Sequence, residues 1–308
     1  MGQTLLVFCL VLISFCSAFN KARANGDPVF DPQLSQALQK SLKNARETLK
    51  TDNVSASLFI SDRCFWEGAV GVTTQDRDVP VNPNTIYGFG SITKTFVAGI
   101  VLQLFDENKL SLDDPLGKWL PKFGNINQKI TVHQLLNHGS GLSGYVNSDR
   151  YWAAINADPD RVWLPEETLK YERRPRGVDV KPQYYTNSNY ILLGLIIQAV
   201  TGNSLSQELQ NRIADPLQLD STYLPVHEFK PGQWANDKKL SISRFSSTWA
   251  AGAIASTSRD IAKWTQTLHT GKFLQPETLK AMRITEPRRI SGMEILMGLG
   301  VWKLVGKK

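Results

Sequence analysis

Apolar and polar positions follow two different patterns in the first part of the chain, one typical of a helix and one typical of strands. Residues 33–50 repeat leucines at helical spacing, which predicts an amphipathic helix. Residues 54–60 and 63–71 are instead rich in β-branched and aromatic side chains, and the Ser61-Asp62 pair between them is typical of a turn. We therefore expect a helix followed by two paired strands. The leucines of the helix are Leu34, Leu38, Leu42 and Leu49.

Residues 91–108 are apolar on most sides and predict one helix that lies in the core. From residue 110 to about 249 the chain is rich in glycine, proline and aspartate, which indicates loops and short helices. One apolar helix, residues 191–201, interrupts this stretch, and at this length it falls short of the roughly 20 residues that span a bilayer.

The last part of the chain returns to regular elements. Residues 257–270 predict a helix that ends at Gly271, where a glycine commonly terminates a helix. Residues 276–282 predict a second short helix, and 297–304 predict a strand. No repeat of fixed period is present. The pattern as a whole predicts a mixed fold of the α/β (α+β) class.

The composition agrees with a soluble globular protein and argues against a nucleic-acid-binding protein. Of 308 residues, 42% are apolar and 20% are charged, so one large domain or two closely packed domains can build a substantial core. The net charge of +7 is scattered along the chain, whereas a nucleic-acid interface usually concentrates lysine and arginine in a stripe. We therefore expect no nucleic-acid partner, and some preference for anionic substrates or cell envelopes.

The first 24 residues predict an export signal. Residues 5–15 form an apolar run of the length of a signal core, and small-residue cleavage sites follow at Cys16-Ser17-Ala18 and Ala22-Arg23-Ala24. We place cleavage after Ala24, which gives a mature domain of residues 25–308, located in the periplasm or secreted, without a stable membrane span. Only Cys64 of the three cysteines would remain, so an internal disulfide is excluded.

The quartet Ser91-Ile92-Thr93-Lys94 carries the first candidate chemistry. On a helix, positions i and i+3 are neighbours, so the Lys94 amine can reach the Ser91 hydroxyl. A lysine whose pKa is lowered by burial can activate a serine as a nucleophile. The alternative is a serine that only caps the helix.

A second polar group lies in residues 184–190, directly before the apolar helix, and includes Tyr185-Thr186-Asn187. The phenol of Tyr185 can relay a proton, and the amide of Asn187 can hold a lysine or a substrate carbonyl. The alternative is an aromatic loop that seals the helix, with Asn187 or Asn189 as its cap.

These two motifs, in this order, resemble the serine β-lactamase and penicillin-binding protein superfamily, in the class C-like branch with the D-alanyl-D-alanine carboxypeptidases. Residues 109–115, 130–142 and 250–260 carry the same resemblance. It implies a β-lactamase/transpeptidase-like fold, in which helices flank an antiparallel sheet. Residues 25–108 and 250–308 would form this α/β part, and residues 109–249 a mostly helical part.

The resemblance also implies an activity and a role for each residue. Ser91 would be acylated, Lys94 would take or relay its proton, Tyr185 would act as partner base and then as acid, and Asn187 would bind Lys94 and the substrate's acyl side chain. No metal or organic cofactor is implied. The implied enzyme is a serine hydrolase, first a D-alanyl-D-alanine carboxypeptidase on peptidoglycan stem peptides, with a β-lactam-hydrolysing enzyme or a small-ester esterase as alternatives.

One feature of the resemblance is not matched. The superfamily carries a third motif, Lys or His, then a small residue, then Gly, on a strand beyond the one that residues 297–304 predict. His269-Thr270-Gly271 has this pattern, but we interpret it as a helix end, and His138 as a residue that organises the Gly139-Ser140-Gly141 turn. We therefore expect the later sheet strands to be missing, which leaves a non-catalytic remnant as the second hypothesis.

Overall fold

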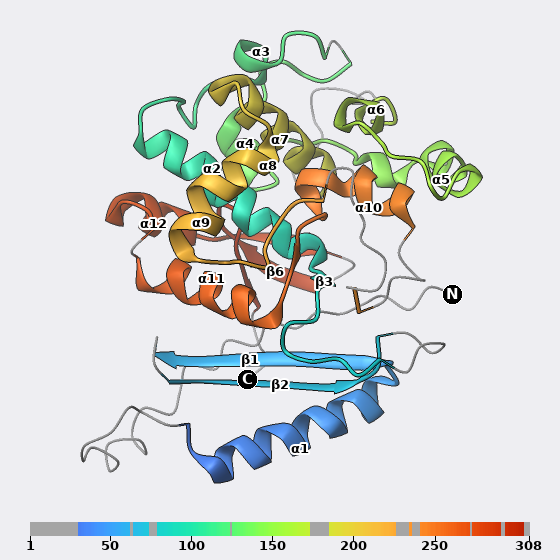
Figure 1. Ribbon diagram of the computed structural model, residues 1–308. Coiled ribbons are helices and arrows are strands. Elements are labelled where there is room, and N and C mark those ends of the chain that lie inside the picture. The colour runs from blue at the N-terminus through green and yellow to red at the C-terminus, as the bar shows by residue number, and fades with distance from the viewer. Residues whose placement is uncertain are drawn as a thin grey trace.

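The computed structural model describes residues 30–61, 64–73, 79–123, 125–172, 185–225, 234–235, 241–271, 273–290 and 293–304, so the predicted leader lies outside the described residues. Helices make up most of this part, and the strands form three small antiparallel groups (Figure 1). None of the helices in these ranges combines the length and the apolar composition that crossing a membrane requires.

Named strands lie near the two ends of the described chain, and a run of helical elements, in which η marks 3-10 and π turns, lies between them. The helices are α1 Pro32–Leu49, α2 Thr93–Asp106, α3 Leu116–Trp119, α4 Val132–Leu136, α5 Asp149–Ala157, α6 Pro165–Leu169, α7 Asn187–Thr201, α8 Leu205–Leu209, α9 Asp215–Leu217, α10 Ile242–Thr248, α11 Ser258–Thr270 and α12 Pro276–Arg283. The turns are η1 Gly90–Ile92, η2 Tyr145–Asn147, η3 Gln210–Ala214 and η5 Trp249–Ala251. The strands are β1 Asn53–Ser61, β2 Cys64–Gly71, β3 Tyr87–Gly88, β4 Ala255–Ser256, β5 Glu286–Ile290, β6 Met293–Met297 and β7 Trp302–Leu304.

The first helix and the first two strands confirm the sequence prediction. Asp31 caps α1, since its carboxylate accepts the Leu34 backbone N–H at 2.7 Å. Strands β1 and β2 pair antiparallel, with Val54 opposite Val70. Helix α1 packs against β2 and α11 against β1, so the hairpin lies between two helices (Figure 1).

The predicted strand at residues 297–304 is wrong in part. The chain forms an antiparallel β5-β6-β7 sheet, and a turn at residues 298–301 separates β6 from β7. Gly300 in this turn has φ +82°, and a Cβ there would lie 2.3 Å from Ala98 of α2, so both conformation and space require glycine. Strand β5 contains Pro287 and lies at the sheet edge, where a missing N–H is tolerated.

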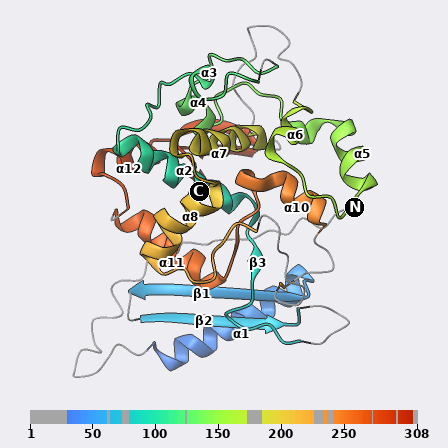
Figure 2. The same ribbon diagram turned by 45° about the horizontal axis from the view of Figure 1, so that its top comes forward.

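Helices α2 and α7 pack against each other in the centre of the helical layer (Figure 2). Phe96, Ile100 and Leu104 of α2 and most apolar residues of α7 are fully buried. A helix that is apolar on all sides is buried in this way. The prediction of one helix over 91–108 is confirmed for its body, but its start is a 3-10 turn, η1, before α2.

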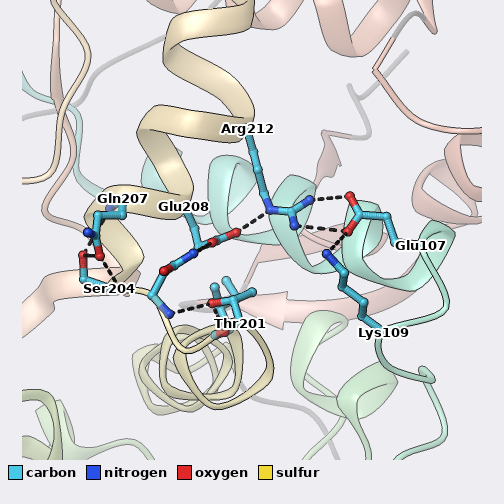
Figure 3. Close-up of polar contacts among 9 residues, drawn as sticks. Glu107, Lys109, Thr201, Ser204, Gln207, Glu208 and Arg212 are labelled. Carbon is cyan, nitrogen blue, oxygen red and sulfur yellow. Dashed lines mark hydrogen bonds and ion pairs between the residues drawn. The ribbon is translucent and has the colours of Figure 1, made fainter.

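An ion-pair cluster ties the end of α2 to the α8–η3 segment (Figure 3). Arg212 donates to both carboxylate oxygens of Glu107, at 2.6 and 3.1 Å, and also contacts Glu208. Lys109 adds a 2.8 Å contact to Glu107. These contacts, with the hydrogen bond from Arg212 first among them, lower the pKa of Glu107 to about 2.

Candidate functional site

The segment before Ser91 is held by a strand pair far away in sequence. Strand β3 pairs with β4, and the Phe89 N–H donates to the Ile254 carbonyl at 3.0 Å. Gly90 then turns the chain with φ +53°, a left-handed conformation that side chains with a Cβ rarely adopt. The turn leaves Ser91 exposed and directs Lys94 into the interior.

Lys94 is buried, with 2% of its surface exposed, and its Nζ atom contacts three oxygen atoms. These are Ser91 Oγ at 3.2 Å, Asn187 Oδ1 at 2.9 Å and the Ala251 carbonyl at 2.5 Å. The carbonyl and amide oxygens can only accept hydrogen bonds. A neutral amine would use its two N–H groups on them and keep its lone pair for Ser91.

Burial lowers the pKa of Lys94 well below its usual value, because the ammonium loses hydration that the neutral amine does not need. The rings of Tyr185 and Tyr190 lie 4.9 and 5.6 Å from Nζ and favour the cation, each by about 1 to 2 kcal/mol in a desolvated site. Within the described ranges no carboxylate pairs with Lys94, so desolvation remains the dominant effect.

The Tyr185 hydroxyl donates a 2.6 Å hydrogen bond to Ser91 Oγ. Burial raises the pKa of the Tyr185 phenol, and the hydrogen bond with Ser91 offsets this only in part. The phenol is therefore protonated at neutral pH and can act as a proton donor. Its ring contacts His138 at 4.4 Å and the exposed Trp302 at 5.1 Å between centroids.

Asn187 is the first residue of α7, so the helix predicted to begin at residue 191 begins four residues earlier, inside the segment predicted as a loop. The expectation that Asn187 or Asn189 could cap the helix is wrong, because Thr186 is the cap and accepts the Ser188 N–H at 3.2 Å. This leaves the Asn187 side chain available to Lys94, as its 2.9 Å contact shows.

His138 lies under the Tyr185 segment. Its Nδ1 accepts the Thr186 N–H at 3.2 Å and lies 3.1 Å from the Asn189 amide. The adjacent turn is held by other residues: Asn137 Oδ1 accepts the Gly139 N–H, and Ser140 Oγ accepts the Leu142 N–H. His138 reaches this turn through Asn189, whose Oδ1 accepts from Ser140 Oγ at 2.6 Å, so its organising role stays a prediction. No group of metal-ligating side chains occurs in the described part of the chain.

The Ala251 carbonyl was not predictable as a site group, since a backbone oxygen leaves no side-chain signal in a sequence. The structure places it by linking its segment to α2: the Ile254 N–H donates to Thr93 Oγ1 at 3.0 Å, next to Lys94. The other histidine pattern, His269-Thr270-Gly271, confirms its interpretation as the end of α11, where Gly271 has φ +76°.

The four residues proposed from sequence thus meet at one point. Ser91 Oγ contacts an amine of lowered pKa and a protonated phenol, and Asn187 holds the amine. A hydroxyl between a base and an acid is the arrangement that nucleophilic acyl transfer requires.

Comparison with known proteins places this arrangement among relatives. The chain is 26% identical to a penicillin-binding protein, PbpX, described as putative, of Bacillus subtilis, over 90% of this chain and 76% of that protein. It is 28% identical to the teichoic acid D-alanine hydrolase of Staphylococcus aureus, over 82% of this chain and 60% of that protein. Among solved structures, a D-stereospecific amidohydrolase from Streptomyces matches at a TM-score of 0.73 and 28% identity, covering 86% of this chain and 83% of that one.

The fold seen here, mixed α/β with small antiparallel sheets, is that of these structural relatives. The family model described as Beta-lactamase matches residues 38–302, which include Ser91, Lys94, Tyr185 and Asn187. The chain therefore belongs to the Beta-lactamase family, in the β-lactamase/transpeptidase-like superfamily of serine hydrolases.

Proposed function

We propose that this protein is a serine hydrolase that works through an acyl-enzyme on Ser91. One observation carries the proposal: Lys94 Nζ and Tyr185 Oη both contact Ser91 Oγ, at 3.2 and 2.6 Å. The directions of the two pKa shifts support a neutral amine and a protonated phenol on either side of the nucleophile.

In the first half of the proposed reaction, neutral Lys94 takes the Ser91 proton while Oγ attacks the substrate carbonyl. The Ser91 N–H, at the positive end of the helix, stabilises the developing oxyanion, a contribution of about 3 kcal/mol per donor. Tyr185 donates its proton to the leaving group as the scissile bond breaks. The acyl group is then bound to Ser91, with an ammonium and a phenolate beside it.

In the second half, water attacks the acyl carbonyl and gives its proton to the Tyr185 phenolate. The Lys94 ammonium returns its proton to Ser91 Oγ as the ester bond breaks. Both groups thereby regain their starting states, so the protons balance over one turnover. Asn187 holds Lys94 during both steps and is proposed to contact the acyl side chain of the substrate.

We propose D-amino acyl amides and esters as the substrate class, because one relative is a teichoic acid D-alanine hydrolase and another a D-stereospecific amidohydrolase. The leading candidate is a peptidoglycan stem peptide, which would make the protein a D-alanyl-D-alanine carboxypeptidase of the class C-like branch. A β-lactam or a small ester is the alternative. We further propose export to the periplasm or outside the cell, on the basis of the export signal predicted from sequence for residues 1–24.

The test is acyl transfer to Ser91. The protein is incubated separately with fluorescent penicillin, D-alanyl p-nitroanilide and p-nitrophenyl acetate. Intact-mass spectrometry and peptide mapping should then show an adduct on the Ser91 peptide with at least one of them. Ser91→Ala should abolish the adduct and lower turnover by at least about 1000-fold.

Circular dichroism of both proteins provides the control for folding. Folded wild-type protein that forms no adduct and turns over none of the three acyl donors would refute the proposal and favour the non-catalytic remnant. The relative rates with the amide, the lactam and the ester then choose among the substrate classes.

A further inference from the structure

Glu172 is a buried carboxylate, 6% exposed, that is not among the four residues at the reacting atoms. Its Oε1 accepts hydrogen bonds from the Ser143 N–H at 2.7 Å, Ser143 Oγ at 2.6 Å and the Gly144 N–H at 3.0 Å. Its Oε2 accepts from the Gly144 N–H at 3.1 Å and Ser188 Oγ at 2.6 Å. Two separate segments of the chain are thus joined through one side chain.

Both segments lead directly to the site. Ser188 follows Asn187 in the first turn of α7, and its Oγ also accepts the Tyr145 N–H at 3.2 Å. The Tyr145 side chain is fully buried, and its hydroxyl donates to the Ser247 carbonyl at 2.9 Å.

The position of Asn187 follows from this arrangement. Asn187 is the first residue of α7, and Glu172 holds the first turn of this helix through Ser188, the next residue. Asn187 Oδ1 then faces Lys94, which is the orientation seen in its 2.9 Å contact. If the first turn of α7 moved, Asn187 Oδ1 would lose this contact with Lys94.

We infer that Glu172 is a positioning residue of the acyl-transfer site: by joining Ser143 and Gly144 to Ser188, it holds the first turn of α7, and with it Asn187, in the geometry that keeps Lys94 directed at Ser91. This inference rests on the proposed function. A buried carboxylate is stable only when hydrogen bonds replace its water, and here they come from the two segments that must be joined. In the described structure Glu172 has no hydrogen bond with Ser91, Lys94 or Tyr185, so its effect passes through other residues.

Three variants separate the effect of the hydrogen bonds of Glu172 from the effect of its charge. Glu172→Gln keeps an oxygen for Ser143 and Gly144 and an N–H that can donate to Ser188, so it preserves the connection without the charge. Glu172→Ala removes the connection altogether, and Ser188→Ala removes only the link to α7. Asp260→Asn is the matched control, because Asp260 is also a buried carboxylate with backbone and hydroxyl donors, at Ser221 and Thr222, and none of them touches the site.

The measurement is the rate of Ser91 acylation per folded molecule, as a function of pH, with whichever acyl donor acylates the wild type. We expect Glu172→Ala to lower the maximal rate by about 100-fold with little change in KM, since a misplacement near 1 Å costs about that much. Ser188→Ala should fall between Glu172→Ala and wild type, and Glu172→Gln should stay within about threefold of wild type. In Glu172→Ala, water admitted to Lys94 should move the midpoint of the pH–rate profile to higher pH.

Loss of stability alone would lower the melting temperature without changing the rate per folded molecule, as we expect for Asp260→Asn. If Glu172→Ala does not fold, Ser188→Ala and Glu172→Gln decide: wild-type rates in Ser188→Ala, or a 100-fold loss in Glu172→Gln, overturn the positioning role. If the wild type itself is never acylated, the proposed function fails and this inference falls with it. If the wild type is acylated and every folded variant matches it, only the inference fails.

Discussion

The hydrogen-bond capacity of one amine is the most informative feature at the residue scale. Lys94 has two acceptors that cannot donate, Asn187 Oδ1 and the Ala251 carbonyl, and one neighbour, Ser91, that can do either. The neutral amine satisfies all three with its two N–H groups and its lone pair. The pKa of Lys94 is lowered by burial, so this form is available well below the pH at which a free lysine loses its proton.

The pKa shifts of Lys94 and Tyr185 determine how the acylation rate depends on pH. A lowered pKa means that the active base form of Lys94 appears as pH rises through that lowered value, so acylation should level off well below 10.5, the usual pKa of lysine. The raised pKa of Tyr185 means that its acid form is lost only above its usual value of 10. We therefore expect a plateau between these limits, measured as acylation rate from pH 5 to 11.

Substitution of Lys94 by arginine tests whether Lys94 is the base that accepts the Ser91 proton. Arginine keeps its proton at every accessible pH, so it cannot accept the Ser91 proton. We expect Lys94→Arg to lose about 100- to 10,000-fold in acylation rate at all pH values, the usual range for a general base. A wild-type rate in Lys94→Arg, or a wild-type profile that keeps rising to pH 10.5, would show that Lys94 is not the base.

The sequence predicted the side chains of the site but not their full surroundings. The spacing of Ser91 and Lys94 placed them together by helix geometry, and both motifs supplied chemistry that side-chain type reveals. Ala251 contributes a backbone oxygen, and Glu172 is a carboxylate in an unremarkable polar stretch, so neither leaves a local signal. Their roles depend on long-range packing, which spacing along one chain does not encode.

At the element scale, the close packing of α7 against η5 determines where the Ala251 carbonyl lies. Gly194 of α7 faces this turn, and a Cβ at Gly194 would lie 2.6 Å from the Ala250 Cβ and 2.7 Å from the Trp249 ring. Contacts this short require one of the two elements to move. The helix therefore needs glycine at this position for packing, although glycine is otherwise unfavourable inside a helix.

Replacing Gly194 by alanine should thus act on both stability and activity. We expect overpacking to cost about 1 to 3 kcal/mol of unfolding free energy, measured by urea denaturation. Displacement of η5 should also slow Ser91 acylation. The matched control is Ala199→Ser, at an exposed position of the same helix, which should change stability by less than about 0.5 kcal/mol. Equal stability of Gly194→Ala and wild type would contradict the packing argument.

Elements were predictable where the apolar pattern was local and strong. Helices α1, α11 and α12 and the β1–β2 hairpin follow from spacing, capping residues and a turn. The β5-β6-β7 sheet did not, because β5 begins Glu286-Pro287-Arg288 and lacks apolar alternation. The turn at residues 298–301 was hidden in an apolar run, where Gly300 is required by its contact with α2 and Gly298 by its contact with the end of α12, rather than by the local pattern.

At the scale of the whole molecule, Arg212 joins elements that are far apart in sequence. It pairs Glu107 at the end of α2 with Glu208 of α8, and Glu208 is a buried carboxylate. Removing the arginine leaves a buried charge with one remaining partner, Asn203. Such a loss is costly, whereas the exposed contact of Lys109 with Glu107 contributes little.

We expect Arg212→Gln to destabilise the protein by about 1 to 3 kcal/mol at pH 7, and Lys109→Gln by less than about 0.5 kcal/mol. Glu107 has a folded-state pKa of about 2 against an ordinary 4.5, so its contribution is present above pH 4.5 and is lost as pH falls toward 2. The difference in melting temperature between wild type and Arg212→Gln should therefore shrink in acid. A difference that is constant from pH 7 to 3 would contradict this account.

The contacts of Lys94 have a practical consequence for following the protein in cells. Its partners lie at residues 91, 187 and 251, the last of them 157 positions away along the chain. A dye that acylates Ser91 would need all three segments in place. An incomplete, cleaved or misfolded chain would therefore not be labelled. Comparing dye signal with total protein on a gel would count native molecules directly, and would make labelling of the site a measure of folding yield.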